Sequence, residues 1–277
     1  MNASKLFGLD VVRGARTVAR LPRYFRELGE FRRMTEASRQ KFGGVSMFPM
    51  VLDRDASAGS ASGHYFHQDL FVAQKIFAKN PRRHVDVGSR VDGFVAHVAS
   101  FRKIEVVDIR PLSTEAGNIS FRVADATDSV SLGALGRADS VSCLHALEHF
   151  GLGRYGDPLR VDGHEVALRS IASMVETSGT FYVSVPIGRQ RTEFNSHRVF
   201  DVTTLPRLLR EDFELVGFSY VNDDGDLIRH WEEASEESRD IEATIRRLSP
   251  VQCRFGCGIY EFRKFSASMS GPSAGRH

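Results

Sequence analysis

The stretch HVDVGSRVDGF, from His84 to Phe94, decides the fold. It begins with a short apolar run that ends at Asp86-x-Gly88, and such a run predicts a buried strand that is closed by a glycine turn. The residues from Val91 onward have helical spacing. A strand that turns directly into a helix is the opening unit of a doubly wound sheet, which binds ligands at the carboxyl ends of its strands.

The rest of the chain alternates between the same two patterns. Apolar runs predict six more strands, over 103–109, 119–125, 139–144, 179–186, 213–221 and 256–264. Helices are predicted over 64–80, 91–101, 164–177, 202–211 and the second half of the acidic stretch 223–247. Strands separated by helices imply right-handed crossovers and a parallel sheet with helices on both faces. We therefore predict an α/β fold with a doubly wound, Rossmann-like, mostly parallel sheet of seven strands. An antiparallel edge strand is expected because the last two strands lack a clear crossover helix.

The first 52 residues are predicted to be a basic helical extension. Residues 1–50 hold ten Lys and Arg against four Asp and Glu, and apolar residues recur at helical intervals, with Pro22 expected to break or kink the run. One interpretation is a dock for an anionic membrane surface or a partner; the other is a solvated helix packed on the main domain. A polar loop separates this extension from a main domain predicted over 64–265, and 266–277 is predicted to be a disordered tail.

Bulk properties indicate a soluble protein of a reducing compartment. The net charge of +2 gives no reason to expect nucleic acid. Three cysteines form no disulfide-like framework, no secretory signal is evident, and nothing approaches the roughly 20 apolar residues of a membrane span. We expect a cytoplasmic protein, with the basic extension as a means of peripheral contact with the inner face of the membrane.

The turn after the first strand narrows the choice of cofactor. It lacks the G-x-G-x-x-G spacing that a dinucleotide needs, which disfavours a nicotinamide or flavin enzyme. The order hydrophobic-Asp86-x-Gly88 instead resembles motif I of class I S-adenosylmethionine-dependent methyltransferases. That resemblance implies an acceptor for the two ribose hydroxyls in Asp108, at the end of IEVVDI, and a partner for the adenine amino group in Asp125, in VADAT. It also assigns Asp86, Gly88, Ser89, Arg90 and Leu144 to the cofactor site.

A closer resemblance covers His64 to Lys264. The segments GHYFHQD, HVDVGSRVDGF, VVDIRPL, LHALEHFGLGRYGD, YVSVPIG, FNSHRVF and CGIYEF together resemble DUF268, a family of unknown function that is often linked to surface-polysaccharide genes. The resemblance implies a methyltransferase-like domain whose substrate is a saccharide or sugar nucleotide. Arg90 and Asp92 stand where methyltransferases continue with glycines, and their side chains either crowd the methionine carboxylate or, for Arg90, bind it.

The segment LHALEH carries the order H-x-x-E-H, in His145, Glu148 and His149. On a helix these side chains would share one face, as in one class of zinc proteases. A position just after the fourth strand does not fit a protease, but some O-methyltransferases bind a divalent metal through a related E-x-x-E-H. The candidate ligands are then His145, Glu148, His149 and His197, a set that would favour a transition metal over magnesium. Two other interpretations stay open: His145, His149 or His197 as a general base without metal, and a purely structural Leu-Glu-His.

Two polar segments are candidates for substrate contact. In GLGRYGD, Tyr155 could stack on a sugar and Arg154 could pair with a phosphate or carboxylate, or the glycines could simply form a tight turn. After the fifth strand, Asn195 and Arg198 are either substrate contacts or residues that pin a loop. We expect an O-methyltransferase acting on a saccharide or sugar nucleotide in surface-polysaccharide biosynthesis. The alternative is a catalytically inactive binding module, with the membrane as one place of action.

Overall fold

The computed structural model describes residues 11–38, 42–231 and 240–266. The chain forms two compact units, residues 1–60 and 61–277. The tail predicted over 266–277 lies outside the described residues except for Ser266.

The N-terminal unit consists of one long helix and the segment that follows it. Helix α2, Val11–Ala37, runs through Pro22 without ending, so the predicted break does not occur. Arg20 donates to the carbonyl of Val51 at 3.3 Å and pairs with Asp55, which lies in the short helix η1, Asp53–Asp55. In the described parts of the chain, no helix has the length and apolarity needed to cross a membrane.

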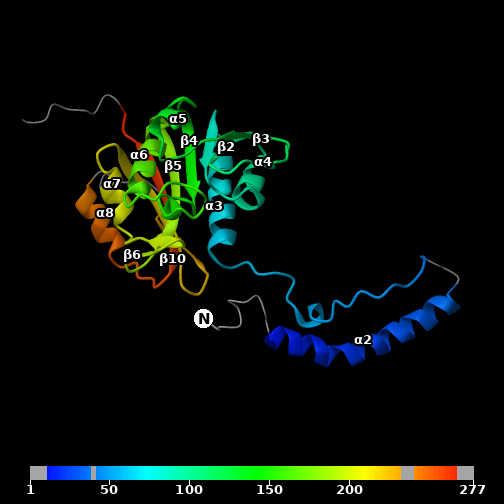
Figure 1. The fold of residues 1–277 in the computed structure, drawn as a ribbon. Coiled ribbons are helices and arrows are strands. Elements are labelled where there is room, and N and C mark those ends of the chain that lie inside the picture. Colours follow the sequence, from blue (N-terminus) through cyan, green and yellow to red (C-terminus); the bar gives the residue numbers. More distant parts are fainter. Residues whose placement is uncertain (1–10, 39–41, 232–239, 267–277) are drawn as a thin grey trace, which may run out of the picture. The chain divides into compact units, whose positions relative to one another are not determined.

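The second unit is built on an eight-stranded sheet in the order β3-β2-β1-β4-β5-β10-β8-β9 (Figure 1). The strands are β1 His84–Val87, β2 Ile104–Asp108, β3 Ile119–Val123, β4 Ala138–Leu144, β5 Val175–Ile187, β8 Phe213–Val221, β9 Leu227–Trp231 and β10 Gly256–Lys264. Strands β1 to β5 are parallel to one another, and their order 3-2-1-4-5 is that of the doubly wound nucleotide-binding sheet. The predicted fold class is confirmed.

Helices cover both faces of this sheet. They are α3 His64–Lys79, the π-turn η2 Val91–Val95, α4 Ala96–Ala99, α5 Ser129–Gly133, α6 Gly163–Ser173, α7 Thr204–Leu209 and α8 Ile241–Leu248. Apolar side chains of α3, η2 and α4 form one core with one face of the sheet, and those of α5, α6, α7 and α8 form a larger core with the other. Burial of alternate strand side chains against helices on each side stabilises this three-layer arrangement.

The C-terminal half departs from the prediction in three places. The last strand, β10, is antiparallel and lies between β5 and β8, while an eighth strand, β9, forms the antiparallel edge. Strand β9 was missed because the charged surroundings of Leu227–Trp231 mask its short apolar pattern. The predicted helix 164–177 ends at Ser173, since β5 begins at Val175. A small hairpin, β6 Arg191–Glu193 and β7 His197–Val199, follows β5.

Candidate active site

A cleft of about 260 Å³ opens at the carboxyl ends of β1, β2 and β4. Seven predicted site residues line it: Gly88, Arg90, Asp108, Asp125, His145, His149 and Tyr155. The other lining residues are Tyr65, Val87, Val107, Ile109, Arg110, Ala124, Ala126, Ala146, Phe150 and Asp157. The position is the one where doubly wound sheets bind their ligands.

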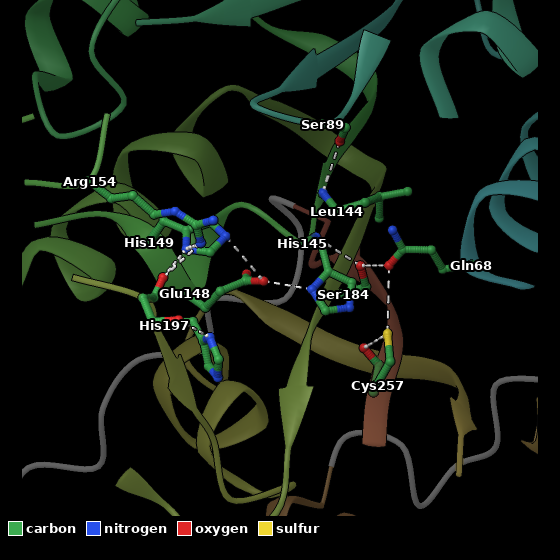
Figure 2. Close-up of polar contacts among 12 residues, drawn as sticks. Gln68, Ser89, Leu144, His145, Glu148, His149, Arg154, Ser184, His197 and Cys257 are labelled. Atoms are coloured by element: carbon green, nitrogen blue, oxygen red, sulfur yellow. Dashed lines mark hydrogen bonds and ion pairs between the residues drawn. The ribbon is translucent and has the colours of Figure 1, made fainter. Parts of the chain in front are cut away.

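Hydrogen bonds among buried residues hold the turn after β1 in place. Gly88 has a φ of +78°, and a Cβ there would lie 2.8 Å from the Cβ of Ala146, so only glycine fits. Asp86 is fully buried and accepts hydrogen bonds from Ser89 N at 3.1 Å and from the hydroxyls of Ser89 and Ser142. Burial raises the pKa of the Asp86 carboxyl to about 6. Leu144 N donates to Ser89 Oγ at 3.1 Å (Figure 2). Asp86, Ser89 and Leu144 therefore fix the turn and are not among the residues that line the cleft.

Arg90 replaces a glycine of motif I and lies at the cleft wall. Its guanidinium pairs with Asp92 at 2.8 Å and lies 5.1 Å from the ring centre of Tyr65. The turn it begins is a π-turn with Gly93 at its centre, where a Cβ would lie 2.5 Å from the Asp69 carboxylate of α3. Gly93 therefore allows α3 to approach this turn closely.

Asp108 ends β2 with both carboxylate oxygens engaged. Oδ1 accepts from the backbone N of Arg110 at 2.8 Å and from its Nε at 3.0 Å, and Oδ2 accepts from its Nη2 at 2.7 Å. The guanidinium of Arg110 also lies 4.3 Å from the ring centre of Tyr155, across the cleft. A ligand diol can hydrogen-bond to both oxygens of the Asp108 carboxylate only if the half-exposed Arg110 side chain moves.

Asp125 follows β3 and also lines the cleft. It accepts from the backbone N and the hydroxyl of Thr127, both at 2.8 Å, and both bonds go to Oδ1. The turn therefore does not need Oδ2, which stays available as an acceptor for a ligand amino group.

The H-x-x-E-H segment does not form the helix that would place its three side chains on one face. His145 has a left-handed backbone with a φ of +50°, and only Leu147–His149 form a short 3-10 helix, η3. The cause is the pairing of β4 with β5: the backbone N of His145 donates to the carbonyl of Ser184 at 3.0 Å, which continues the sheet where a helix would have to begin.

Glu148 nevertheless lies between the two imidazoles (Figure 2). Its Oε1 is 2.6 Å from His145 Nδ1 and 3.8 Å from His149 Nε2, and its side chain is buried. Burial opposes charge on the His145 ring, but Cys257 and Glu148 outweigh it and raise the pKa of this imidazole. Burial likewise opposes charge on Glu148, and His145 outweighs it and lowers the pKa of the carboxyl.

His149 has a defined tautomer. Its Nδ1 lies 2.7 Å from the carbonyl oxygen of Ser196, which can only accept, so the neutral ring carries its proton on Nδ1. The lone pair is then on Nε2, and the residue lines the cleft. Burial lowers the pKa of His149, which favours this neutral form. The ring can therefore act as a base.

His197 does not join the other three predicted metal ligands. Its Nδ1 contacts Ser196 Oγ at 2.8 Å and its Nε2 faces Glu193 at 3.3 Å, both within the β6–β7 hairpin, and it does not line the cleft. Within the described residues, the group with metal-ligand geometry is His64, His145 and Cys257. The predicted four-residue set is therefore corrected: it shares only His145 with that group.

The loop GLGRYGD is a tight turn that contributes Tyr155 and Asp157 to the lining of the cleft. Asp157 accepts from Gly151 N at 2.7 Å and from Gly153 N at 3.3 Å, and both glycines have positive φ. Tyr155 lines the cleft, whereas Arg154 donates to the carbonyl of Ser196 at 3.0 Å.

The surroundings of the two predicted substrate contacts after β5, Arg198 and Asn195, indicate a structural role. Arg198 is buried and donates to the carbonyls of Phe150 at 2.6 Å and Val161 at 3.2 Å. It therefore stabilises the loop that borders the cleft. Asn195 lies exposed in the hairpin turn with a φ of +59°. Neither lines the cleft.

The sequence prediction missed two residues of the site. Arg110 follows Asp108 by two positions, and a guanidinium so close to a predicted ribose carboxylate was a usable signal. Cys257 reaches the site from β10, which lies far away in the sequence, and no local pattern marks it.

Solved structures with a similar fold include several described as methyltransferases. NodS, an N-methyltransferase from Bradyrhizobium japonicum in complex with S-adenosyl-L-homocysteine, aligns over 79% of this chain and 93% of that chain, with 12% identity and a TM-score of 0.47. A SAM-dependent methyltransferase from Anabaena variabilis aligns over 72% and 85%, with 12% identity and a TM-score of 0.47. An O-methyltransferase family protein from Burkholderia thailandensis aligns over 72% and 55%, with 12% identity and a TM-score of 0.44. The order of the strands, and not these distant likenesses, carries the fold assignment.

One family model matches the sequence, and no curated protein matches it. The model is described as "Caenorhabditis protein of unknown function, DUF268" and covers residues 134–247. This range contains the segments LHALEHFGLGRYGD, YVSVPIG and FNSHRVF. The resemblance to DUF268 is thereby confirmed over residues 134–247.

Proposed function

We propose that the protein is an S-adenosylmethionine-dependent O-methyltransferase that acts on a saccharide or sugar nucleotide in surface-polysaccharide biosynthesis. One observation carries the proposal: Gly88, Asp108 and Asp125 meet at one cleft, and the basic nitrogen of His149 belongs to a residue of the same cleft. A glycine turn, two carboxylates and a base are the groups that a nucleoside-linked methyl donor and a hydroxyl acceptor require.

The residues fit the cofactor in three respects. Gly88 lines the cleft, and the absence of a Cβ lets this turn pass close to Ala146. Asp108 offers two acceptors for a vicinal diol once Arg110 has moved, and Asp125 offers Oδ2 to an amino group. Arg90 offers a cation to a carboxylate group at the cleft wall.

The base is supplied by the chain itself. S-adenosylmethionine brings an electrophilic methyl group when it is bound. A sugar hydroxyl is a poor nucleophile at neutral pH, so a base must take its proton as the new bond forms. His149 Nε2 can take that proton, and the carbonyl of Ser196 holds the ring in the required tautomer. Orientation of the hydroxyl against the methyl group supplies much of the remaining rate.

The acceptor side suits a sugar that carries an anionic group. The Tyr155 ring has the guanidinium of Arg110 at 4.3 Å and that of Arg154 at 5.1 Å from its centre. An aromatic face binds the apolar face of a sugar, and guanidinium groups bind phosphate. This combination supports a sugar nucleotide or phosphorylated saccharide.

A direct test is methyl transfer from isotopically labelled S-adenosylmethionine to a panel of sugar nucleotides and free saccharides. We expect an O-methylated product from the phosphorylated members, identified by mass spectrometry. Transfer to nitrogen or sulfur acceptors alone, or transfer to none of the panel by a protein that binds the cofactor, would contradict the proposal.

A second candidate is a methyltransferase-like module that has lost catalysis. The observation that favours it is the bidentate pair between Arg110 and Asp108, which satisfies the ribose-binding carboxylate without a ligand. Such a module would transfer no methyl group to any member of that panel.

We also propose that the protein is cytoplasmic and that its N-terminal unit contacts the inner face of the membrane. Exposed apolar side chains of α2, among them Phe25, Phe31 and Met34, lie among its arginines, a composition that suits an anionic lipid surface. Flotation with anionic liposomes should recover the full chain and not a chain without residues 1–60. Equal recovery would remove the idea.

A further inference from the structure

Three side chains from distant parts of the sequence meet beside the cleft. His64 is the first residue of α3, His145 follows β4, and Cys257 is the second residue of β10. A ligand atom of each, a ring nitrogen or the Sγ, lies within 4.8 Å of those of the other two. Cys257 is fully buried, and the His145 side chain is only 6% exposed.

His145 is oriented as a metal ligand is. Its Nδ1 donates to Glu148 Oε1 at 2.6 Å, because a carboxylate can only accept. This hydrogen bond directs Nε2 as the remaining ligand atom, and Nε2 is buried without a hydrogen-bond partner. Histidines that bind metals typically donate their other N–H to a carboxylate, which fixes the ring and makes it a stronger ligand.

The other two side chains lie against His145 and its neighbours. The Cys257 Sγ lies 3.6 Å from Gln68 Oε1, 3.9 Å from the carbonyl oxygen of Gly258 and within 4.8 Å of a ring nitrogen of His145. Gln68 Oε1 already accepts a short hydrogen bond from the Ser184 hydroxyl. The His64 ring stacks on that of His145, with 5.3 Å between ring centres, and packs against Phe255 on its other side.

We propose that His64, His145 and Cys257 form a binding site for a divalent transition metal of the zinc class. Imidazole nitrogens and a thiolate are the ligands that zinc prefers, and three protein ligands leave a fourth position for water or a substrate atom. With bonds of about 2.0 to 2.3 Å, ligand atoms around a tetrahedral zinc lie about 3.3 to 3.6 Å apart. Small side-chain rotations of His64 and Cys257 close the present triangle to that size.

The site differs from the metal site that the sequence pattern predicted. Glu148 holds His145 in place and is not itself a ligand, while His149 remains free to act as a base. Since His145 also lines the cleft, the metal would lie at the acceptor side. The inference concerns metal binding and does not depend on methyl transfer.

The test uses the full chain, freed of metal by a chelator and then titrated with Zn²⁺ in competition with a chromogenic chelator. We expect one equivalent to bind. With Co²⁺ as the probe, we expect the visible bands of a tetrahedral ion together with a thiolate charge-transfer band. Cys257→Ser should abolish the charge-transfer band, and Glu148→Gln should weaken Zn²⁺ binding about 10- to 100-fold.

Matched controls keep the test decisive. His64→Gln changes a half-buried residue at the start of a helix, so it should fold even if Cys257→Ser does not, and it should weaken Zn²⁺ binding at least tenfold. His67→Gln, one turn further along α3, and Cys253→Ser, the nearby cysteine outside the group, should bind Zn²⁺ as the wild type does. The absence of stoichiometric binding, or equal binding by His64→Gln and the wild type, would overturn the proposal.

Discussion

The two sides of the cleft are held in place in different ways. On the side of β1 to β3, each carboxylate is fixed by a residue two or three positions further on: Asp86 by Ser89, Asp108 by Arg110 and Asp125 by Thr127. On the side of β4 and β5, the partners are distant. His145 depends on Ser184, and both His149 and Arg154 depend on the carbonyl of Ser196.

This difference predicts that the two sides can be damaged separately. Short turns fold with their own strands, so the cofactor side should tolerate changes around the β6–β7 hairpin. The side of β4 and β5 should lose its geometry when the hairpin is altered, because the carbonyl of Ser196 orients His149 and Arg154, and Arg198 supports the carbonyl of Phe150 just before the GLGRYGD loop.

The largest separation is expected from His149→Ala. Removal of a general base typically lowers the rate by about 10²- to 10⁴-fold, so kcat should fall by this factor in the labelled-methyl assay. Calorimetric affinity for S-adenosylhomocysteine should stay within about threefold of the wild type, because the cofactor carboxylates are untouched. A variant that kept its kcat would remove His149 from the mechanism.

The next effect is on stability. In Gly151→Ala the new Cβ would lie 2.2 Å from the carbonyl oxygen of Arg160 at a φ of +81°, so the free energy of unfolding should fall by more than about 2 kcal/mol. Gly156→Ala is the matched control, since its φ is +85° but no atom lies within 4 Å of the new Cβ. Chemical denaturation should rank wild type, Gly156→Ala and Gly151→Ala in that order. An equal loss in both variants would show that strain at positive φ, and not the close approach, decides.

On the cofactor side, Asp125→Ala should weaken binding of S-adenosylhomocysteine about tenfold, the value of one hydrogen bond to a charged group. Thr127→Val is the control, because it removes a partner of Oδ1 and leaves Oδ2 in place. Unchanged affinity in Asp125→Ala would mean that the adenine group binds elsewhere.

The pH dependence should report His149. Burial lowers the pKa of this imidazole, opposed by Glu148 and assisted by Arg154 and His145. The active form is neutral, so kcat should rise about tenfold per pH unit below that lowered pKa and become constant above it, already below pH 6.5. The residual activity of His149→Ala should lack this inflection. A profile that falls as the pH rises through this range would require a protonated His149.

The smallest effect is expected from Arg110→Ala. A cofactor must displace this guanidinium from Asp108, and exposed ion pairs contribute at most about 1 kcal/mol, so affinity should increase by up to about fivefold. Arg154→Ala also removes a cation from Tyr155 but leaves Asp108 untouched, and its affinity should not change. Weaker binding by Arg110→Ala would make the arginine a ligand of the cofactor.

The same contrast explains how much of the molecule the sequence predicted. The strands β1 to β5, the turn at Gly88 and the carboxylates Asp108 and Asp125 follow from local patterns, because strand ends and their turns are encoded within a few residues. For the side of β4 and β5, the sequence predicted which residues belong to the site but not how their side chains are arranged. The H-x-x-E-H spacing would place its side chains on one face of a helix, but the pairing of His145 with Ser184 of β5 prevents a helix there.

Distant contacts likewise changed the roles of single residues. Arg198 is a residue type that often binds substrates, but here it is buried under the loop that it supports. Cys257 lies in no recognisable local motif, and only the position of β10 brings it close to His145. Strand β10 lies between β5 and β8, and this position brings Cys257 close to His145. The position depends on which strand edges remain free after the first five strands have paired.

The most direct test of the account is calorimetric titration of S-adenosylhomocysteine into the wild type and Asp108→Ala, with the exposed Asp92→Ala as the control. We predict one bound equivalent in the wild type and in Asp92→Ala. Affinity should be at least about 100-fold lower in Asp108→Ala, since a diol would lose two hydrogen bonds to a charged group. No binding by the wild type, or equal binding by Asp108→Ala, would contradict it.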